Sequence, residues 1–202
     1  MTASAQAPDS TIIDRVRPRL VVIIGQPGTG KTTLARLVAA EMGAAHVRLD
    51  AIQAGVVRSG IVNSFGLVGY LVAQEVSAGC LAVGTSVVVD SVSPIANARR
   101  FWRTLAARAG VPLSVIEVIL SDPRERQRRV ESRLSDLDGL PMPTWAHVQL
   151  GSYEPWDLQR DGPRLAVDNL RAPEVTMVEI RKYLDGGQRA ASEPVDSAFP
   201  VE

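Results

Sequence analysis

The sequence has a single cysteine, Cys80, among its 202 residues. One thiol excludes a disulfide within the chain and fits a reducing compartment. No apolar run approaches the roughly 18 residues that a membrane-spanning helix needs. The N-terminus also lacks the basic stretch and apolar core of a secretory signal. We therefore expect a cytoplasmic protein that has no membrane partner.

Net charge is absent as well, because 22 Lys and Arg residues balance 22 Asp and Glu residues. Balanced charge provides no bulk attraction to nucleic acid, which argues against a nucleic-acid partner. The sequence contains no cluster of His and Cys residues that would indicate a zinc site. It also contains no Ser/His/Asp arrangement that would indicate a hydrolase. The length and a hydrophobic content of 46% predict one globular domain with a substantial core.

What the sequence does contain is a phosphate-binding loop in its expected context. Residues 20–24 form a short apolar run rich in β-branched residues, which predicts a buried strand. Residues 25–32 match G-x-x-x-x-G-K-[ST] at every position. Residues from 32 onward have helical spacing and good helix formers. Strand, loop and helix in this order predict a nucleoside triphosphate site.

Each part of the loop has a chemical role. The glycines permit positive φ and close approach of the backbone, whose N–H groups then form an anion site. Lys31 suits the β- and γ-phosphates, and the Thr32 hydroxyl can ligate Mg²⁺. ATP and Mg²⁺ are therefore the expected cofactors. The loop residues predicted to bind them are Gly25, Gln26, Pro27, Gly28, Thr29, Gly30, Lys31, Thr32 and Thr33.

Apolar strand patterns and helical patterns alternate along the rest of the chain. This alternation predicts an α/β fold, in which a parallel sheet is covered by helices on both faces. We expect one domain over residues 18–185 with a lid at about 124–161, and disorder at 1–17 and 186–202. Further strands are predicted at 45–50, 86–90, 113–120 and 164–168, and further helices at 61–81, 95–109, 124–134 and 172–184.

Three acids, Asp50, Asp90 and Asp168, end predicted strands. Because ligands collect at the carboxyl ends of parallel strands, we expect these acids to share one cleft with the phosphate loop. Asp90 follows three valines and is expected to hold the Mg²⁺ shell through water, or else to cap a turn. Asp50 is expected to accept or orient the proton of a substrate hydroxyl, and it can also cap the following helix.

Five arginines crowd the predicted helix at 124–134. Arg129 and Arg133 are four residues apart, which predicts that they share one face of the helix. Such a pair suits a polyphosphate, or a purine base together with a phosphate. We assign Arg133 to phosphate and Arg129 to the base, on a lid that excludes water. A solvated basic face is the alternative.

Several residues keep two interpretations. Either of the arginines that follow the 86–90 strand can contact substrate or lie on the surface. The aromatic residues of the lid region can close over a substrate or form a small satellite core. These residues are Arg99, Arg100, Trp145, His147, Tyr153 and Trp156.

Together these motifs resemble the small P-loop kinases, the group of nucleoside-monophosphate, shikimate and gluconate kinases and chloramphenicol phosphotransferase. The similarity is greatest to bacterial predicted kinases with a zeta-toxin-like or chloramphenicol-phosphotransferase-like core, and it covers about residues 18–185. It rests on Gly-Gln-Pro-Gly-Thr-Gly-Lys-Thr at 25–32, Arg-Leu-Asp at 48–50, Gly-Thr-Ser-Val-Val-Val-Asp at 84–90, Arg-Val-Glu-Ser-Arg at 129–133, Tyr-Glu-Pro at 153–155 and Val-Asp-Asn at 167–169.

The resemblance implies a three-layer P-loop fold with a helical lid and a five-stranded sheet in the order 2-3-1-4-5. It implies that Asp50 is the base and that Asp168, Asn169 and Leu170 lie near the adenine. The resulting hypothesis is a kinase that moves the γ-phosphoryl group of ATP to a hydroxyl of a small molecule, with Lys31, Asp50 and Arg133 as catalytic residues.

Three alternatives remain open. They are a zeta-toxin-like kinase of a nucleotide sugar, a polynucleotide 5′-hydroxyl kinase, and an ATP-binding switch without transfer activity. Residues 51–70 and 91–103, which would shape the acceptor pocket, match no substrate signature, and the sequence does not define the oligomeric state.

Overall fold

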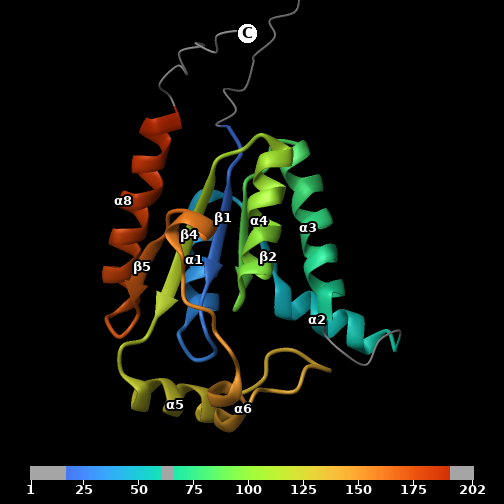
Figure 1. Ribbon diagram of the computed structural model, residues 1–202, viewed down its shortest axis with the longest axis vertical. Helices are drawn as coiled ribbons and strands as arrows, with labels where there is room; N and C mark the ends of the chain where they lie inside the picture. Colours follow the sequence, from blue (N-terminus) through green and yellow to red (C-terminus); the bar gives the residue numbers. More distant parts are fainter. Residues whose placement is uncertain (1–16, 61–65, 192–202) are drawn as a thin grey trace, which may run out of the picture.

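The computed structural model describes residues 17–60 and 66–191, which form one parallel sheet between helical layers (Figure 1). The sheet order is β2-β3-β1-β4-β5 and every neighbouring pair is parallel, so the predicted fold class and strand order are confirmed. The strands are β1 (Leu20–Ile24), β2 (Ala45–Arg48), β3 (Val87–Ser91), β4 (Leu113–Ile119) and β5 (Leu165–Asp168). The helices are α1 (Lys31–Met42), α2 (Leu49–Arg58), α3 (Gly66–Ala82), α4 (Ala96–Ala109), α5 (Pro123–Ser132), α6 (Trp145–Leu150), α7 (Leu158–Asp161) and α8 (Pro173–Ala191).

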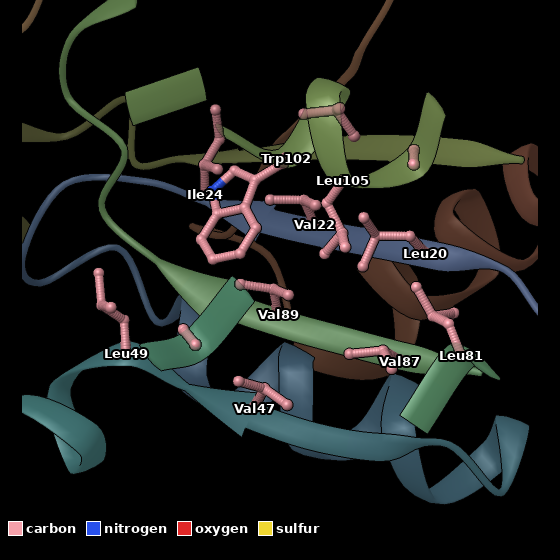
Figure 2. Packing of buried hydrophobic residues seen from close by; sticks show 13 residues of the cluster. Leu20, Val22, Ile24, Val47, Leu49, Leu81, Val87, Val89, Trp102 and Leu105 are labelled. Atoms are coloured by element: carbon pink, nitrogen blue, oxygen red, sulfur yellow. The ribbon is translucent and has the colours of Figure 1, made fainter. Parts of the chain in front are cut away.

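The central strand β1 is buried along its whole length because helices cover both faces of the sheet. Leu20 and Val22 point to the face packed by α3 and α4, where Trp102 and Leu105 of α4 meet them (Figure 2). The intervening Val21 and Ile23 point to the opposite face, which is packed by α1 and α8. These two cores fix the position of the sheet beneath the phosphate loop.

The carboxyl ends of the strands share one edge of the sheet with α5 and α6 (Figure 1). The start of β1 and the end of α8 lie at the opposite edge. None of the described helices combines the length and the apolar character that a membrane span requires.

Several predicted boundaries differ from the structure. Strand β2 ends at Arg48, so Asp50 lies in the first turn of α2 rather than at a strand end. Helix α5 ends at Ser132, and Arg133 is a C-cap with extended φ and ψ of −72° and 128°. The predicted helix therefore extends two residues too far, and the chain turns away after Arg133.

The segment after α5 and the end of the chain also differ from the sequence-based expectation. The expected lid contains the short helices α6 and α7. Helix α8 continues to Ala191, so residues 186–191 are helical although they were assigned to a disordered tail. The glycine pair at 186–187, which normally disfavours a helix, lies inside α8. The expected disorder at 1–16 and 192–202 lies outside the described residues.

Two leucines of α1 allow the packing of the core against the sheet to be tested. Leu34 is fully buried at 0% exposure, whereas Leu37 on the same helix is 39% exposed. We expect Leu34→Ala to lower the free energy of unfolding by about 2–5 kcal/mol, because it leaves a cavity in the core. Leu37→Ala should change it by less than about 1 kcal/mol. Urea denaturation measures both, and equal effects of the two substitutions would contradict this packing.

Candidate active site

The loop between β1 and α1 adopts the conformation that the glycine pattern predicts. Gly28 and Gly30 have φ of 86° and 84°, in the left-handed region that favours glycine. Gly30 is the N-cap of α1, and Lys31 begins the helix. The Thr29 hydroxyl donates a hydrogen bond to the Gln26 carbonyl over 2.9 Å and closes the loop on itself. The loop therefore ends at a helix N-terminus, where backbone N–H groups can bind an anion.

Two neighbouring elements approach this loop so closely that glycine is needed for packing as well. A Cβ at Gly25 would lie 2.5 Å from the Val118 carbonyl oxygen of β4. A Cβ at Gly28 would lie 2.8 Å from a methyl group of Val130, on α5. The loop is thus enclosed between the sheet and the first helix of the lid.

The turn after β5 holds the loop from a third direction. Asn169 donates from Nδ2 to the Thr29 carbonyl over 2.8 Å, and a Cβ at Gly30 would clash with that amide. Arg129 in turn donates to the Asn169 carbonyl over 3.3 Å. Asn169 therefore links the loop to α5, a contact that the sequence did not predict.

The two residues that flank Asn169 were also expected near the adenine. Asp168 accepts hydrogen bonds from the backbone N–H groups of Ser121 and Leu170, each over 3.1 Å. Hydrogen bonding by the Ser121 side chain is the main cause that lowers the pKa of Asp168 below its ordinary value, and the two backbone bonds add to it. The Leu170 side chain is half exposed. Asp168 thus stabilises the turn that presents Asn169.

A cleft of about 370 Å³ opens above the loop. Lys31 is only 4% exposed, and no carboxylate pairs with it in the described part of the chain. Its charge therefore has no protein partner, as a phosphate-binding lysine requires. The predicted site residues that line this cleft are Gly28, Gly30, Lys31, Thr32, Thr33, Arg129 and Arg133.

Asp90 lies in β3 with only 2% exposure, and neither of its carboxylate oxygens has a hydrogen-bond partner. His46 Nε2 and Arg48 Nε each lie 3.9 Å from Oδ2 of Asp90, and both of these nitrogens are also buried without a partner. Burial lowers the pKa of His46, while the Asp90 charge opposes this shift. Buried carboxylates are normally satisfied, so these orphaned oxygens suit a water-mediated Mg²⁺ contact.

The described residues contain no group of three or more His, Cys, Asp or Glu side chains that could hold a metal by itself. A Mg²⁺ ion near Asp90 would therefore take most of its ligands from water and phosphate oxygens, as Mg²⁺ commonly does.

The expectation that three acids share the cleft of the phosphate loop is wrong, since none of them lines it. Asp90 is buried beside the β2 side chains of His46 and Arg48, and Asp168 faces backbone N–H groups. Asp50 is half-buried at the start of α2, and its neighbour Ala51 lines a second cleft of about 540 Å³. The acids are thus distributed around the nucleotide cleft rather than inside it.

Sequence reasoning missed Asp136, which joins the two clefts by lining both. Arg48 donates to both of its carboxylate oxygens over 2.7 and 3.0 Å, and Arg36 donates over 2.9 Å. Arg133 lies 3.6 Å away. The hydrogen bond from Arg48 holds the pKa of Asp136 far below its ordinary value. No sequence signal marks this acid, because Arg48 is 88 residues away along the chain.

The two arginines after β3 have different surroundings. Arg99 is 4% exposed and donates to an oxygen of Asp161 over 2.8 Å, while Arg100 is exposed. The Arg99 guanidinium also lies 5.4 Å from the Tyr153 ring centroid and 5.0 Å from that of Trp156. Arg99 therefore anchors the segment before β5 to α4, and Trp156 of that segment packs against the core on the α3/α4 face of the sheet.

The two remaining residues with open roles belong to α6. The Arg126 guanidinium lies 5.1 Å from the Trp145 ring centroid, which joins α5 to α6. His147 Nδ1 lies 2.7 Å from the Thr144 hydroxyl at the start of α6. Both contacts are within the lid region and stabilise its helices.

A family model described as an AAA domain matches residues 20–147, which is more than half of the chain. The chain belongs to the AAA domain family. A comparison with curated proteins finds no match. The matched part of the chain includes the phosphate loop, Asp50, Asp90, both lid arginines and Asp136.

Solved structures similar to this AAA domain have the fold of small P-loop kinases, so the predicted fold is confirmed. A sugar kinase from Janibacter sp. HTCC2649 is 20% identical, with 83% of this chain and 95% of that chain covered and a TM-score of 0.63. The APS kinase CysC of Mycobacterium tuberculosis, solved with AMPPNP and APS, is 20% identical, with 84% and 98% covered and a TM-score of 0.59. Kti12 of Chaetomium thermophilum, solved with ADP-AlF3, is 21% identical, with 86% and 100% covered and a TM-score of 0.65.

Gly28 of this AAA domain allows the packing of the loop against α5 to be tested. Gly28→Ala requires a left-handed backbone and a Cβ within 2.9 Å of the Arg126 carbonyl oxygen. It should lower the free energy of unfolding by about 1–3 kcal/mol. Gly55→Ala inside α2, where a Cβ meets nothing within 4 Å, should instead raise it by about 0.5–1 kcal/mol. Guanidinium denaturation compares the two, and a neutral Gly28→Ala would contradict the close packing.

Arg99 and Arg100 form a matched pair for testing whether Arg99 anchors the segment before β5. Arg99→Ala should lower the free energy of unfolding by about 3 kcal/mol, because it removes a guanidinium from the buried carboxylate of Asp161. Arg100→Ala should leave stability within about 0.5 kcal/mol of the wild type. Thermal denaturation at matched protein concentration measures both. If the two variants are equally stable, Arg99 does not anchor this segment.

Proposed function

We propose that this protein is an ATP-dependent phosphotransferase that acts on a hydroxyl of a small molecule. The observation that carries the proposal is the cleft at the phosphate loop, which Lys31 lines together with the lid residues Arg129 and Arg133. A loop rich in N–H donors beside converging cations stabilises the charge that develops on a phosphoryl group. The names of two similar structures, a sugar kinase and an APS kinase, support this reading.

The residues of the chain have distinct roles in this proposal. The loop N–H groups bind phosphate oxygens, and Lys31 neutralises their charge. Bound ATP and Mg²⁺ supply the transferable phosphoryl group and the charge that polarises it. Thr32 and Asp90 would hold the Mg²⁺ shell, for which the Asp90 carboxylate is suited because its oxygens accept no hydrogen bond from the described residues. Arg133 stabilises negative charge from the lid side of the cleft, and its position at the helix cap brings it there.

We assign the acceptor to the second cleft, whose walls include Arg48, Ala51 and Ile52. Asp50 lies in the first turn of α2, next to Ala51 of this cleft, and is only half-buried, so it remains accessible to a bound acceptor. Its carboxylate would accept the proton of the acceptor hydroxyl, or orient that hydroxyl for attack. Arg129 and Asn169, which contact each other at the far side of the loop, define the side assigned to the base of the nucleotide.

Two substitutions separate nucleotide binding from transfer. Lys31→Ala should weaken binding of the ATP analogue AMPPNP and abolish transfer, because it removes the only cation of the loop. Asp50→Asn should keep AMPPNP binding within about twofold and slow transfer by about 100-fold or more, because general base catalysis is lost. Calorimetry measures binding, and release of ADP in the presence of a panel of sugars, nucleosides, antibiotics and metabolites measures transfer.

Glu75→Gln on the exposed side of α3 is the charge-matched control, and it should match the wild type in both assays. Normal turnover of Asp50→Asn would refute the assignment of the base. Slow ATP hydrolysis without any phosphorylated acceptor would refute transfer and favour a nucleotide-dependent switch.

A further inference from the structure

Asp136 stands at the junction of the nucleotide cleft and the second cleft, on the segment between α5 and α6. Three guanidinium groups surround its single carboxylate. They come from different parts of the fold, since Arg36 belongs to α1, Arg48 ends β2 and Arg133 caps α5. Even with the carboxylate of Asp90 3.9 Å from Arg48, three guanidinium groups face two carboxylates, which leaves an excess of positive charge.

Arg48 is the fixed part of this cluster. Its side chain is only 6% exposed, and its Nη1 and Nη2 atoms present a two-pronged contact to Asp136. Its Nε is buried without a partner, at 3.9 Å from the nearest oxygen of Asp90. A buried, rigid guanidinium that presents two parallel N–H donors is the arrangement that binds carboxylate, phosphate or sulfate groups. The donor side of the site is therefore built before any ligand arrives.

Asp136 is the replaceable part. Its side chain is 44% exposed, and its segment has no regular secondary structure. By contrast, Arg48 is held in the sheet by the pairing of β2 with β3. An exposed carboxylate on a loop can leave a buried guanidinium if another anion takes its place, because the cation then stays paired.

We propose that Arg36 and Arg48 form the binding site for an oxyanion group of the acceptor, and that Asp136 occupies this site until the acceptor displaces it. The assignment of this anion to the acceptor rests on the proposed function. Arg48 lines only the second cleft, which Ala51 beside Asp50 also lines, whereas Arg133 lines only the nucleotide cleft. An acceptor held at Arg48 by a phosphate, sulfate or carboxylate group would thus lie beside the proposed base.

This site has a test that needs no turnover. Calorimetry measures the binding of inorganic phosphate to the full-length protein with AMPPNP present in excess, so that the nucleotide cleft is filled up to the γ-phosphate position. Asp136→Asn should lower the Kd for phosphate at least about fivefold, because the competing carboxylate is removed. Asp138→Asn removes the same charge two residues away and should leave the Kd unchanged. Equal or weaker phosphate binding by Asp136→Asn would overturn the proposal and indicate a permanent latch.

The arginines decide where the anion binds. In the Asp136→Asn background, Arg36→Gln or Arg48→Gln should remove the gain in affinity. Arg36 also lines the nucleotide cleft, so Arg48→Lys, which keeps the charge but loses the two-pronged contact, is the second variant if Arg48→Gln fails to fold. A gain that survives both substitutions, or that Arg133→Gln alone removes, would place the anion in the nucleotide cleft and overturn the proposal.

The same titration with sulfate and with acetate distinguishes the chemistry of the acceptor group. If Asp136→Asn gains more affinity for phosphate and sulfate than for acetate, the acceptor group is a tetrahedral oxyanion. If it gains more affinity for acetate, the acceptor group is a carboxylate. No gain with any of the three anions overturns the proposal. Each of these measurements detects anion binding directly. A variant that loses only transfer activity is therefore distinguished from one that loses this site.

Discussion

The structure depends on the absence of side chains at three positions of the phosphate loop. Gly25 lies against β4, Gly28 lies against α5, and Gly30 lies against the amide of Asn169. Each approach is too close for a Cβ atom, so the loop is held by the sheet, the lid and the turn after β5 together. Consequently, the same three glycines determine both the shape of the anion site and how closely the lid helix packs against it.

Charge determines the arrangement beyond the loop. Among the described residues, buried Lys31 has no carboxylate partner, and neither oxygen of buried Asp90 has a hydrogen-bond partner. Leaving such groups unsatisfied costs stability, and this cost is offset when phosphate and a hydrated cation pair with them. Bound nucleotide and Mg²⁺ should therefore stabilise the fold. In contrast, the cations around Asp136 are already paired, and an incoming anion would have to compete for them.

The local part of the site could be predicted from the sequence, whereas its long-range pairing could not. The strand, the loop and the first helix follow from contiguous residues, and the sheet order follows from the resemblance to small P-loop kinases. The end of α5 was misplaced because residues 124–134 have helical composition throughout. Nothing in the composition of that segment indicates that the helix ends at Ser132. Likewise, the pairing of Asp136 with Arg48 joins residues far apart in the chain and has no periodic signal.

The fate of the γ-phosphoryl group tests the central claim most directly. The protein can be incubated with Mg²⁺, a small-molecule extract and ATP carrying ¹⁸O in the γ-phosphoryl group, and mass spectrometry then locates the label. If the protein is a phosphotransferase, the label appears on a hydroxyl of one small molecule, in an amount equal to the ADP formed. Label found only in inorganic phosphate, or retained in ATP, would contradict the claim.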